Sequence, residues 1–200
     1  LVCVSYPPQQ ISNIGVDNIS NLIELGFDVL LSQPAPGVWK SLMRRGFLKF
    51  SNFGKSTELA LFSTVPQIAI KYKIPLIFWG ENASLQIGGD KEALSENGYD
   101  GNKVRNLHTL KSGHDWMLKA ELPENKILPY IYPDAKTFRQ NNIQIIYLGW
   151  FLGDWSLKKN GAYSCVEGLK IRPEHPNNNG ELYGISALDE DWVSLNQMLK

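Results

Sequence analysis

The sequence predicts an α/β protein built on a parallel sheet. Short apolar runs that suit buried strands alternate with longer segments of helical periodicity, a pattern that favours crossover connections between parallel strands. The chain has 200 residues, of which 43% are hydrophobic and 20% charged. This length and composition are sufficient for a buried core, and we expect a single domain over residues 1–200. The pattern leaves the strand order open.

Four short runs rich in apolar residues are predicted to be buried strands, each bounded by proline, glycine or polar residues. They are residues 1–6, 27–31, 75–79 and 143–148. The carboxyl ends of parallel strands lie along one edge of a sheet, and ligands bind there in open α/β sheets. The residues that follow these strands are therefore the first candidates for a site.

Helical periodicity marks most segments between these strands. Asp17 is expected to cap the first helix and Gly26 to end it. Pro66 is expected to kink or break the third helix, which Ser56 or Thr57 caps. The expected helices are 18–25, 36–50, 56–73, 103–110, 113–120, 135–141 and 186–200.

Two further features concern the organisation of the chain. Residues 83–130 contain several turn signals, such as Asn97-Gly98, and are interpreted as a polar insertion rather than a second domain. The chain begins inside a predicted strand and stops inside a predicted helix, which indicates a fragment truncated at both ends. The region after 148 reads as rich in loops.

Composition excludes several classes of protein. Twenty basic and twenty acidic residues give a formal net charge of zero, which disfavours a dedicated nucleic-acid binder. Cys3 and Cys165 are too few for a disulfide scaffold or a four-cysteine zinc site, and they suit a reducing cytoplasm. No apolar run approaches the length of about 18 residues that a membrane span needs, and the sequence predicts no signal peptide. The histidines lack metal-ligand spacing, so no protein-held metal site is expected.

The end of the third predicted strand is the sharpest candidate site. Gly80 permits close backbone approach to a ligand, and Glu81 and Asn82 follow at once. A carboxylate beside a carboxamide can orient an amide, bind a hydroxyl or hold Mg²⁺. A solvated turn explains the same residues about equally well.

The end of the fourth predicted strand is rich in aromatic residues. Trp150, Asp154 and Trp155 place aromatic faces beside a carboxylate, an arrangement that suits a sugar or an adenine ring. Packing under a loop is the somewhat stronger interpretation of these aromatics on composition alone.

Several stretches together resemble one known family. They are residues 14–22, 39–47, 69–82 and 146–151 and the pair Asp154-Trp155, with Ile-Pro-Leu-Ile-Phe-Trp-Gly-Glu-Asn as the most specific part. These stretches, which span most of the chain, resemble the N-acetyl sugar amidotransferases, bacterial enzymes of surface-polysaccharide and O-antigen biosynthesis.

The resemblance implies a fold and an activity. The fold is that of the PP-loop ATP pyrophosphatases, a Rossmann-like parallel sheet of the adenine nucleotide alpha hydrolase type. The activity converts the acetamido group of a nucleotide-linked N-acetyl sugar into an acetamidino group, in lipopolysaccharide biosynthesis. ATP, with Mg²⁺, adenylates the amide oxygen, and ammonia from a partner glutaminase and channel subunit displaces AMP.

The resemblance also implies roles for residues on the nucleotide side of the site. Ser5 and Tyr6 resemble the wall that meets adenine, and Gly80 resembles part of the second nucleotide-side loop. Glu81 and Asn82 in the same loop are the expected catalytic residues.

The resemblance also implies contacts to the sugar, and the sequence differs from the family pattern in two respects. Trp150, Asp154 and Trp155 are the expected contacts to the sugar. The Ser-Gly-Gly-x-Asp-Ser phosphate loop of the family does not occur in the sequence and is expected before Leu1, so the fragment alone is expected to be inactive. Residues 52–58 lack the cysteines of many relatives, so no thiol or metal role transfers to them.

Two alternatives stay open. Another PP-loop enzyme, such as one that thiolates tRNA, is disfavoured by the neutral charge and the absence of cysteine pairs. A non-catalytic nucleotide-binding or interaction module agrees with the missing phosphate loop.

Overall fold

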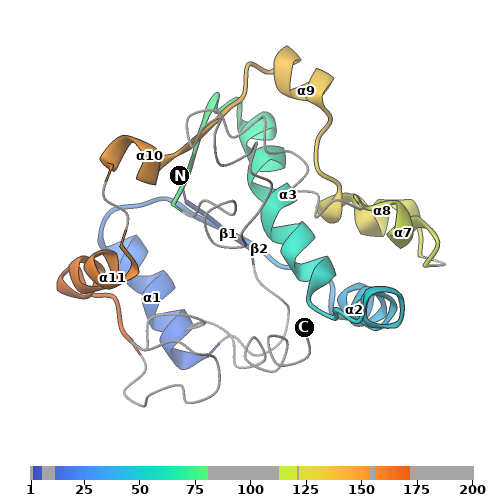
Figure 1. Cartoon of the computed structure of the whole chain (residues 1–200), viewed down its shortest axis with the longest axis horizontal. Coiled ribbons are helices and arrows are strands. Elements are labelled where there is room, and N and C mark those ends of the chain that lie inside the picture. The colour runs from blue at the N-terminus through green and yellow to red at the C-terminus, as the bar shows by residue number, and fades with distance from the viewer. Residues whose placement is uncertain (1, 6–11, 81–112, 121, 154–155, 172–200) are drawn as a thin grey trace. The chain divides into compact units, whose positions relative to one another are not determined.

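The chain contains helices and parallel strands, so the predicted α/β class is confirmed. The computed structural model describes residues 2–5, 12–80, 113–120, 122–153 and 156–171 (Figure 1). Its contacts divide the chain into two compact units. Unit 1 comprises Leu1–Thr57 and Ser156–Lys200, and unit 2 comprises Glu58–Trp155.

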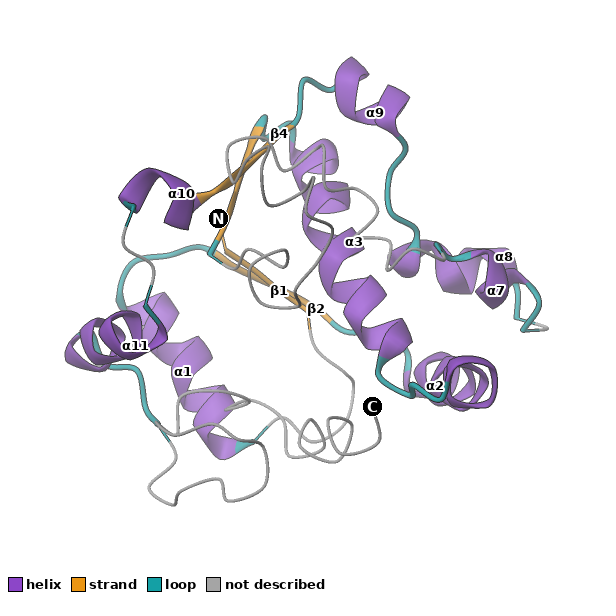
Figure 2. Ribbon diagram, in the orientation of Figure 1, coloured by secondary structure: helices purple, strands orange, loops and turns teal. Residues whose placement is uncertain are grey.

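Four short strands pair in parallel. In unit 1, β1 (Val2–Ser5) pairs with β2 (Val29–Ser32). In unit 2, β3 (Leu76–Trp79) pairs with β4 (Gln144–Tyr147) (Figure 2). The parallel orientation agrees with the prediction, whereas the described strands form two two-stranded sheets where the sequence predicted one. Each pair joins strands that follow one another in the chain across a helical connection, as in βαβ units.

Helix α1 (Asn13–Glu24) starts earlier than expected. Ser12 has extended backbone angles, and its hydroxyl accepts a hydrogen bond from Gly15 N–H at 3.0 Å. Ser12 is therefore the N-cap, and the prediction that Asp17 caps the helix is wrong, because Asp17 lies inside it.

The end of α1 agrees with the prediction. Gly26 has a φ of 91°, and the N–H groups of Gly26 and Phe27 donate to the carbonyls of Ile23 and Leu22. This pair of bonds is the Schellman turn, in which a left-handed residue satisfies the last helical carbonyls.

Three more helices end in the same turn. They are α3 (Lys55–Tyr72), α9 (Ala135–Gln140) and α11 (Leu157–Val166). Their left-handed residues are Lys73, Asn142 and Gly168, each followed by a residue whose N–H reaches back to the helix. After α1, α3 and α9 this turn directs the chain into β2, β3 and β4.

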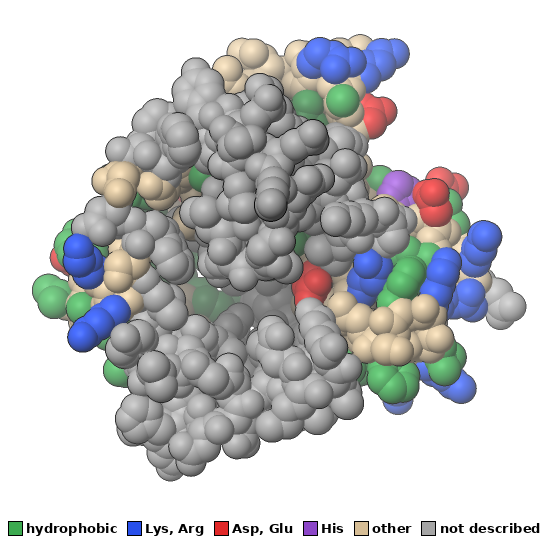
Figure 3. All heavy atoms as spheres, viewed as in Figure 1, with side chains coloured by type: hydrophobic (Ala, Val, Ile, Leu, Met, Phe, Trp, Pro, Cys, Tyr) green, Lys and Arg blue, Asp and Glu red, His purple; other side chains and the backbone are tan. Residues whose placement is uncertain are grey.

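Helix α2 (Pro36–Phe50) has the predicted bounds. Leu42 and Trp39 are buried, whereas Lys40 and Arg44 are exposed, and Lys and Arg side chains are visible over α2 in Figure 3. The helix therefore buries apolar side chains on one side and presents basic side chains on another.

Helix α3 runs through Pro66 without a break. Proline cannot donate the usual bond to the carbonyl four residues earlier, but the Pro66 side chain is fully buried. Packing of the helix outweighs the loss of one hydrogen bond, because most helical stability in proteins comes from tertiary contacts.

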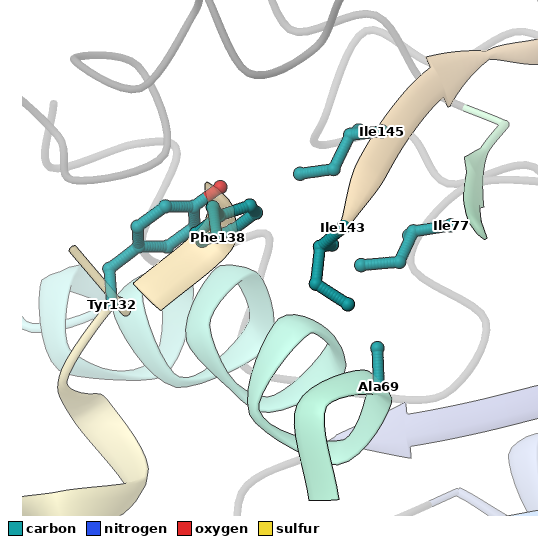
Figure 4. Packing of buried hydrophobic residues seen from close by; sticks show 6 residues of the cluster. All are labelled: Ala69, Ile77, Tyr132, Phe138, Ile143 and Ile145. Atoms are coloured by element: carbon teal, nitrogen blue, oxygen red, sulfur yellow. The ribbon is translucent and has the colours of Figure 1, made fainter. Parts of the chain in front are cut away.

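The core of unit 2 gathers side chains from α3, α9, β3, β4 and the segments that join them (Figure 4). Tyr132 and Phe138 stack with their ring centroids 5.6 Å apart. Ile77 and Ile145, which are partners in the register of β3 and β4, are 5% and 1% exposed. The buried cluster is Ala69, Ile77, Tyr132, Phe138, Ile143 and Ile145.

The region interpreted as a polar insertion is described from residue 113 onward, and there it buries apolar side chains. It forms α7 (Asp115–Leu118), α8 (Glu124–Ile127) and the 3₁₀ helix η2 (Leu128–Tyr130). The buried side chains are Trp116, Met117, Ala120, Ile127 and Tyr130. The helix expected over 113–120 is shortened to α7, and the helix expected over 103–110 lies outside the described residues.

This segment is attached to α3 by side chains of α3. Ser63 Oγ donates to the carbonyl of Pro129. Gln67 Nε2 donates to the carbonyls of Leu128 and Ile131, at 2.9 and 2.6 Å. The bonds satisfy backbone groups of a stretch that has little regular structure of its own.

After β4 the chain forms α10 (Leu148–Leu152) and α11. A loop-rich region was expected here, so α11 corrects the prediction. Ser156 caps it by accepting from Lys159 N–H, a signal that the sequence contains. The helix expected over 186–200 lies outside the described residues.

In unit 1, polar side chains of α1 hold the segment that follows α11. Asn18 Nδ2 donates to the carbonyl of Lys170, and Asn18 Oδ1 accepts from the N–H of Lys170. Asn21 Nδ2 donates to the carbonyl of Glu167, and the Lys170 ammonium pairs with Asp17 at 2.9 Å. A single amide side chain thus satisfies both backbone groups of one residue.

Gly168 allows a sharp test of this arrangement. Its φ is 97°, and an added Cβ would lie 2.5 Å from Asn21 Oδ1. Gly26 has a similar φ, but its added Cβ would meet nothing within 4 Å. Gly26→Ala should lower the free energy of unfolding by about 1–2 kcal/mol through backbone strain. Gly168→Ala should cost about 0.5–1.5 kcal/mol more, because Asn21 must also give up its hydrogen bond.

Urea denaturation measures both effects. In an Asn21→Ala background the two glycine substitutions should cost the same. Equal costs in the wild-type background would show that Asn21 does not lock this turn.

Candidate functional site

The carboxyl ends of the strands lie together in pairs. Ser5 is in register with Ser32 at the ends of β1 and β2. Trp79 is in register with Tyr147 at the ends of β3 and β4. Within each unit, the residues that follow the two strands therefore start from the same sheet edge, as the sequence predicts.

The described candidates occupy positions at these edges. Ser5 is the last residue of β1. Gly80 follows β3 directly and is exposed, and a Cβ added there would meet nothing within 4 Å. Trp150 lies in α10, the helix that starts where β4 ends. Five other candidates lie outside the described residues: Tyr6, Glu81, Asn82, Asp154 and Trp155.

Gly80 has no positive φ, so its backbone conformation does not require glycine. The space around the Gly80 Cα is open, because the residue has no side chain and no atom beyond its chain neighbours lies within 4 Å of the position that a Cβ would take. This openness at the end of a strand fits the expected role of Gly80, in which a ligand approaches the backbone closely.

Two of the buried tyrosines of unit 2 have strongly raised pKa values. Burial raises the pKa of Tyr130, in η2, and of Tyr147, at the end of β4, well above the usual value of about 10. Both hydroxyls therefore stay protonated at any physiological pH and can act only as neutral hydrogen-bonding groups.

These phenols predict how stability depends on alkaline pH. Below pH 10 both remain protonated in the folded and unfolded chains and stability is unaffected. Above pH 10 the unfolded chain loses protons that the folded chain keeps, so the free energy of unfolding should fall by about 1.4 kcal/mol per pH unit for each tyrosine. Chemical denaturation between pH 9 and about pH 11 measures this slope.

Variants identify the groups responsible. Tyr130→Phe and Tyr147→Phe should each remove the contribution of one tyrosine to the slope of stability against pH. Tyr163→Phe, at an exposed position, is the matched control and should leave the slope unchanged. A slope that survives in the double variant would assign the alkaline loss to other groups.

The start of α3 carries polar residues for which the sequence predicted a capping role. Ser56 and Thr57 lie inside the helix, because it begins at Lys55, so the prediction that one of them is the N-cap is wrong. Ser56 is 0% exposed and Lys55 8% exposed. Thr57 Oγ1 accepts a hydrogen bond from Trp39 Nε1 at 2.9 Å. The order Gly-Lys-Ser-Thr at a helix start was the available signal, but burial of the two side chains is a tertiary property.

Of the residues expected to hold ATP and Mg²⁺, the structure describes only Ser5 and Gly80, both on the nucleotide side. The described residues contain no group of three or more His, Cys, Asp or Glu side chains placed to hold a metal. Glu81 and Asn82, which the sequence offers as a pair able to hold Mg²⁺, lie outside the described residues. Ser5 and Gly80 stand at strand ends, where nucleotides bind in parallel sheets.

Comparison of the chain with protein-family models gave no match, and comparison with curated proteins gave none either. In the part of the chain that the structure describes, no helix is both long and apolar enough to cross a bilayer.

Proposed function

We propose that the intact protein is an ATP-dependent amidotransferase that converts an acetamido group of a nucleotide-linked N-acetyl sugar into an acetamidino group. The observation that carries the proposal is the parallel register of the strands, with Ser5 beside Ser32 and Trp79 beside Tyr147. In each unit this register brings two candidate strand ends to one edge. Resemblance of the sequence to N-acetyl sugar amidotransferases supplies the chemistry.

The proposal includes a finer fold, a Rossmann-like parallel sheet of the adenine nucleotide alpha hydrolase type. The parallel pairing of β1 with β2 and of β3 with β4 supports it, because such folds are built from parallel strands joined by helical connections.

Residues of this chain would position the reactants. Ser5 and Tyr6 would meet the adenine, and Gly80 would let a phosphate approach the backbone. Glu81 and Asn82 would orient the acetamido group, and Trp150, Asp154 and Trp155 would hold the sugar. ATP supplies the adenylyl group that turns the amide oxygen into a leaving group. A glutaminase and channel partner, in the cytoplasm, would deliver the ammonia.

Two measurements test the proposal. The coding sequence before Leu1 should encode a Ser-Gly-Gly-x-Asp-Ser turn, and an unrelated sequence there would reduce the proposal to a statement about fold. The intact protein, given ATP, ammonia and a nucleotide-linked N-acetyl sugar, should release AMP and pyrophosphate and replace the amide oxygen by NH. Mass spectrometry of the sugar detects the exchange, and unchanged sugar would contradict the proposed activity.

A further inference from the structure

The first turn of α3 holds two polar side chains that are almost entirely removed from water. Ser56 is 0% exposed and Lys55 is 8% exposed. Their neighbour Thr57 is anchored, because its Oγ1 accepts the hydrogen bond from Trp39. The turn therefore has a defined geometry in which its buried polar groups are held in place.

Ser56 has no side-chain hydrogen-bond partner in the part of the chain that the structure describes. Its Oγ is one of the buried side-chain atoms for which the described structure offers no donor or acceptor. Ser56 is the second residue of α3, and helical Cα–Cβ bonds tilt toward the N-terminus of the helix. The hydroxyl is thus directed to the end where the first backbone N–H groups have no carbonyl within the helix and the dipole is positive.

Positive charge gathers beside the same turn. The ammonium of Lys55 lies 4.6 Å from the centroid of the Phe50 ring, and that of Lys49, in the last turn of α2, lies 5.2 Å from it. Two lysines from consecutive helices therefore meet at one ring. Part of the effect of Lys49 is to offset the dipole of α2, whereas Lys55 adds its charge to the positive end of α3.

We propose that the first turn of α3 binds a phosphate-type oxyanion through the Ser56 hydroxyl and the first backbone N–H groups of the helix, with Lys55 as the supporting charge. A tetrahedral anion offers the Ser56 hydroxyl an acceptor and brings negative charge to the positive end of the helix dipole. Gly54-Lys55-Ser56-Thr57 has the residue order that ends a P-loop, but Lys49 stands where a P-loop has its first glycine. The site is therefore a helix terminus without a P-loop, and the inference does not depend on amidotransferase activity.

Burial of the hydroxyl affects how the anion binds. An anion that reaches Ser56 Oγ is shielded from water. In such a low-dielectric environment a charge-assisted hydrogen bond is stronger than in solvent. The anion must first displace the groups that cover the hydroxyl, so association should be slower than a diffusion-limited encounter.

Thermal unfolding of the full 200-residue chain tests the proposal. The Tm of the wild-type chain should rise with the concentration of inorganic phosphate, compared with sodium chloride at the same ionic strength, since a ligand that binds only the folded state stabilises it. Ser56→Ala should raise the Tm without phosphate, because it removes an unsatisfied buried hydroxyl. The same variant should lose the dependence on phosphate.

Tyr130→Phe is the matched control. It also removes a buried hydroxyl that has no partner in the described structure, but in unit 2, so it should raise the Tm and keep the full response to phosphate. An equal phosphate response in Ser56→Ala and the wild type, or no response in the wild type, would overturn the proposal.

Two further arms identify the source of the anion and the sign of the local field. A larger shift with ATP or a uridine diphosphate sugar than with phosphate or pyrophosphate assigns the site to a nucleotide, and the reverse assigns it to a free anion. Glu58→Gln removes the carboxylate in the same turn and should lower the Kd for phosphate. Weaker binding in that variant would contradict the electrostatic basis of the site.

Discussion

Asn82→Ala in the intact protein should abolish amidine formation while leaving the fold unchanged. The carboxamide directly follows Glu81 at the end of β3, where the proposed reaction needs a group that donates to one reactant atom and accepts from another. Loss of one positioned donor to a developing charge typically lowers kcat by about 10²–10³-fold. Product formation measured by mass spectrometry, with the Tm recorded in parallel, checks both parts of the prediction.

Two companion variants define the role of Asn82. Asn82→Asp keeps an oxygen acceptor and loses the amide donor, so low activity in this variant would assign the donor as the required group. Asn13→Ala, on the exposed start of α1, is the matched control and should retain full activity. Normal turnover in Asn82→Ala would remove this residue from the site.

Ile145→Ala should destabilise unit 2 by about 2–5 kcal/mol. Ile145 is 1% exposed and lies in the buried cluster between α3, α9 and the β3–β4 pair. The substitution removes buried methyl groups and leaves a cavity that close packing cannot fill completely. Chemical denaturation gives the overall loss, and hydrogen exchange at the amides of Gln144–Tyr147 locates it.

Graded variants separate the cavity effect from a general sensitivity of the chain. Ile145→Val should cost only about 0.5–1.5 kcal/mol. Leu152→Ala, at a side chain that is 66% exposed, should change stability by less than about 0.5 kcal/mol. A loss below about 1 kcal/mol for Ile145→Ala would mean that this cluster does not hold β3 and β4 against α3.

Local signals in the sequence predict many of the elements. The expected helix over 135–141 matches α9, whose N-cap is Asp134, and α2 has the expected bounds, because caps and periodicity are properties of neighbouring residues. The continuity of α3 through Pro66 was not predictable in this way, since burial of the proline ring is decided by distant segments. Burial of Trp116 and Met117 was missed for the same reason.

The candidate site likewise has features that the sequence predicts and features that depend on tertiary packing. Parallel orientation predicts that strand ends share an edge of a sheet, and the register places Ser5 beside Ser32 and Trp79 beside Tyr147. Which strands would be neighbours was not predictable, because the pattern leaves the strand order open. The sequence does not reveal that Ser56 is fully buried and that its hydroxyl has no hydrogen-bond partner among the described residues, because a serine at a helix start is usually a solvated cap. The roles of Glu81 and Asn82 stay predictions.

The discontinuity of unit 1 has a consequence for biosynthesis. The chain leaves this unit after Thr57 and returns at Ser156, and the bonds from Asn18 to Lys170 join residues 152 positions apart. On the ribosome, unit 2 is synthesised in one stretch and is complete before Lys170 leaves the exit tunnel. The nascent α1 must therefore wait, with its polar anchors unused, until the last part of unit 1 has been translated, and closure of so long a loop is a slow step.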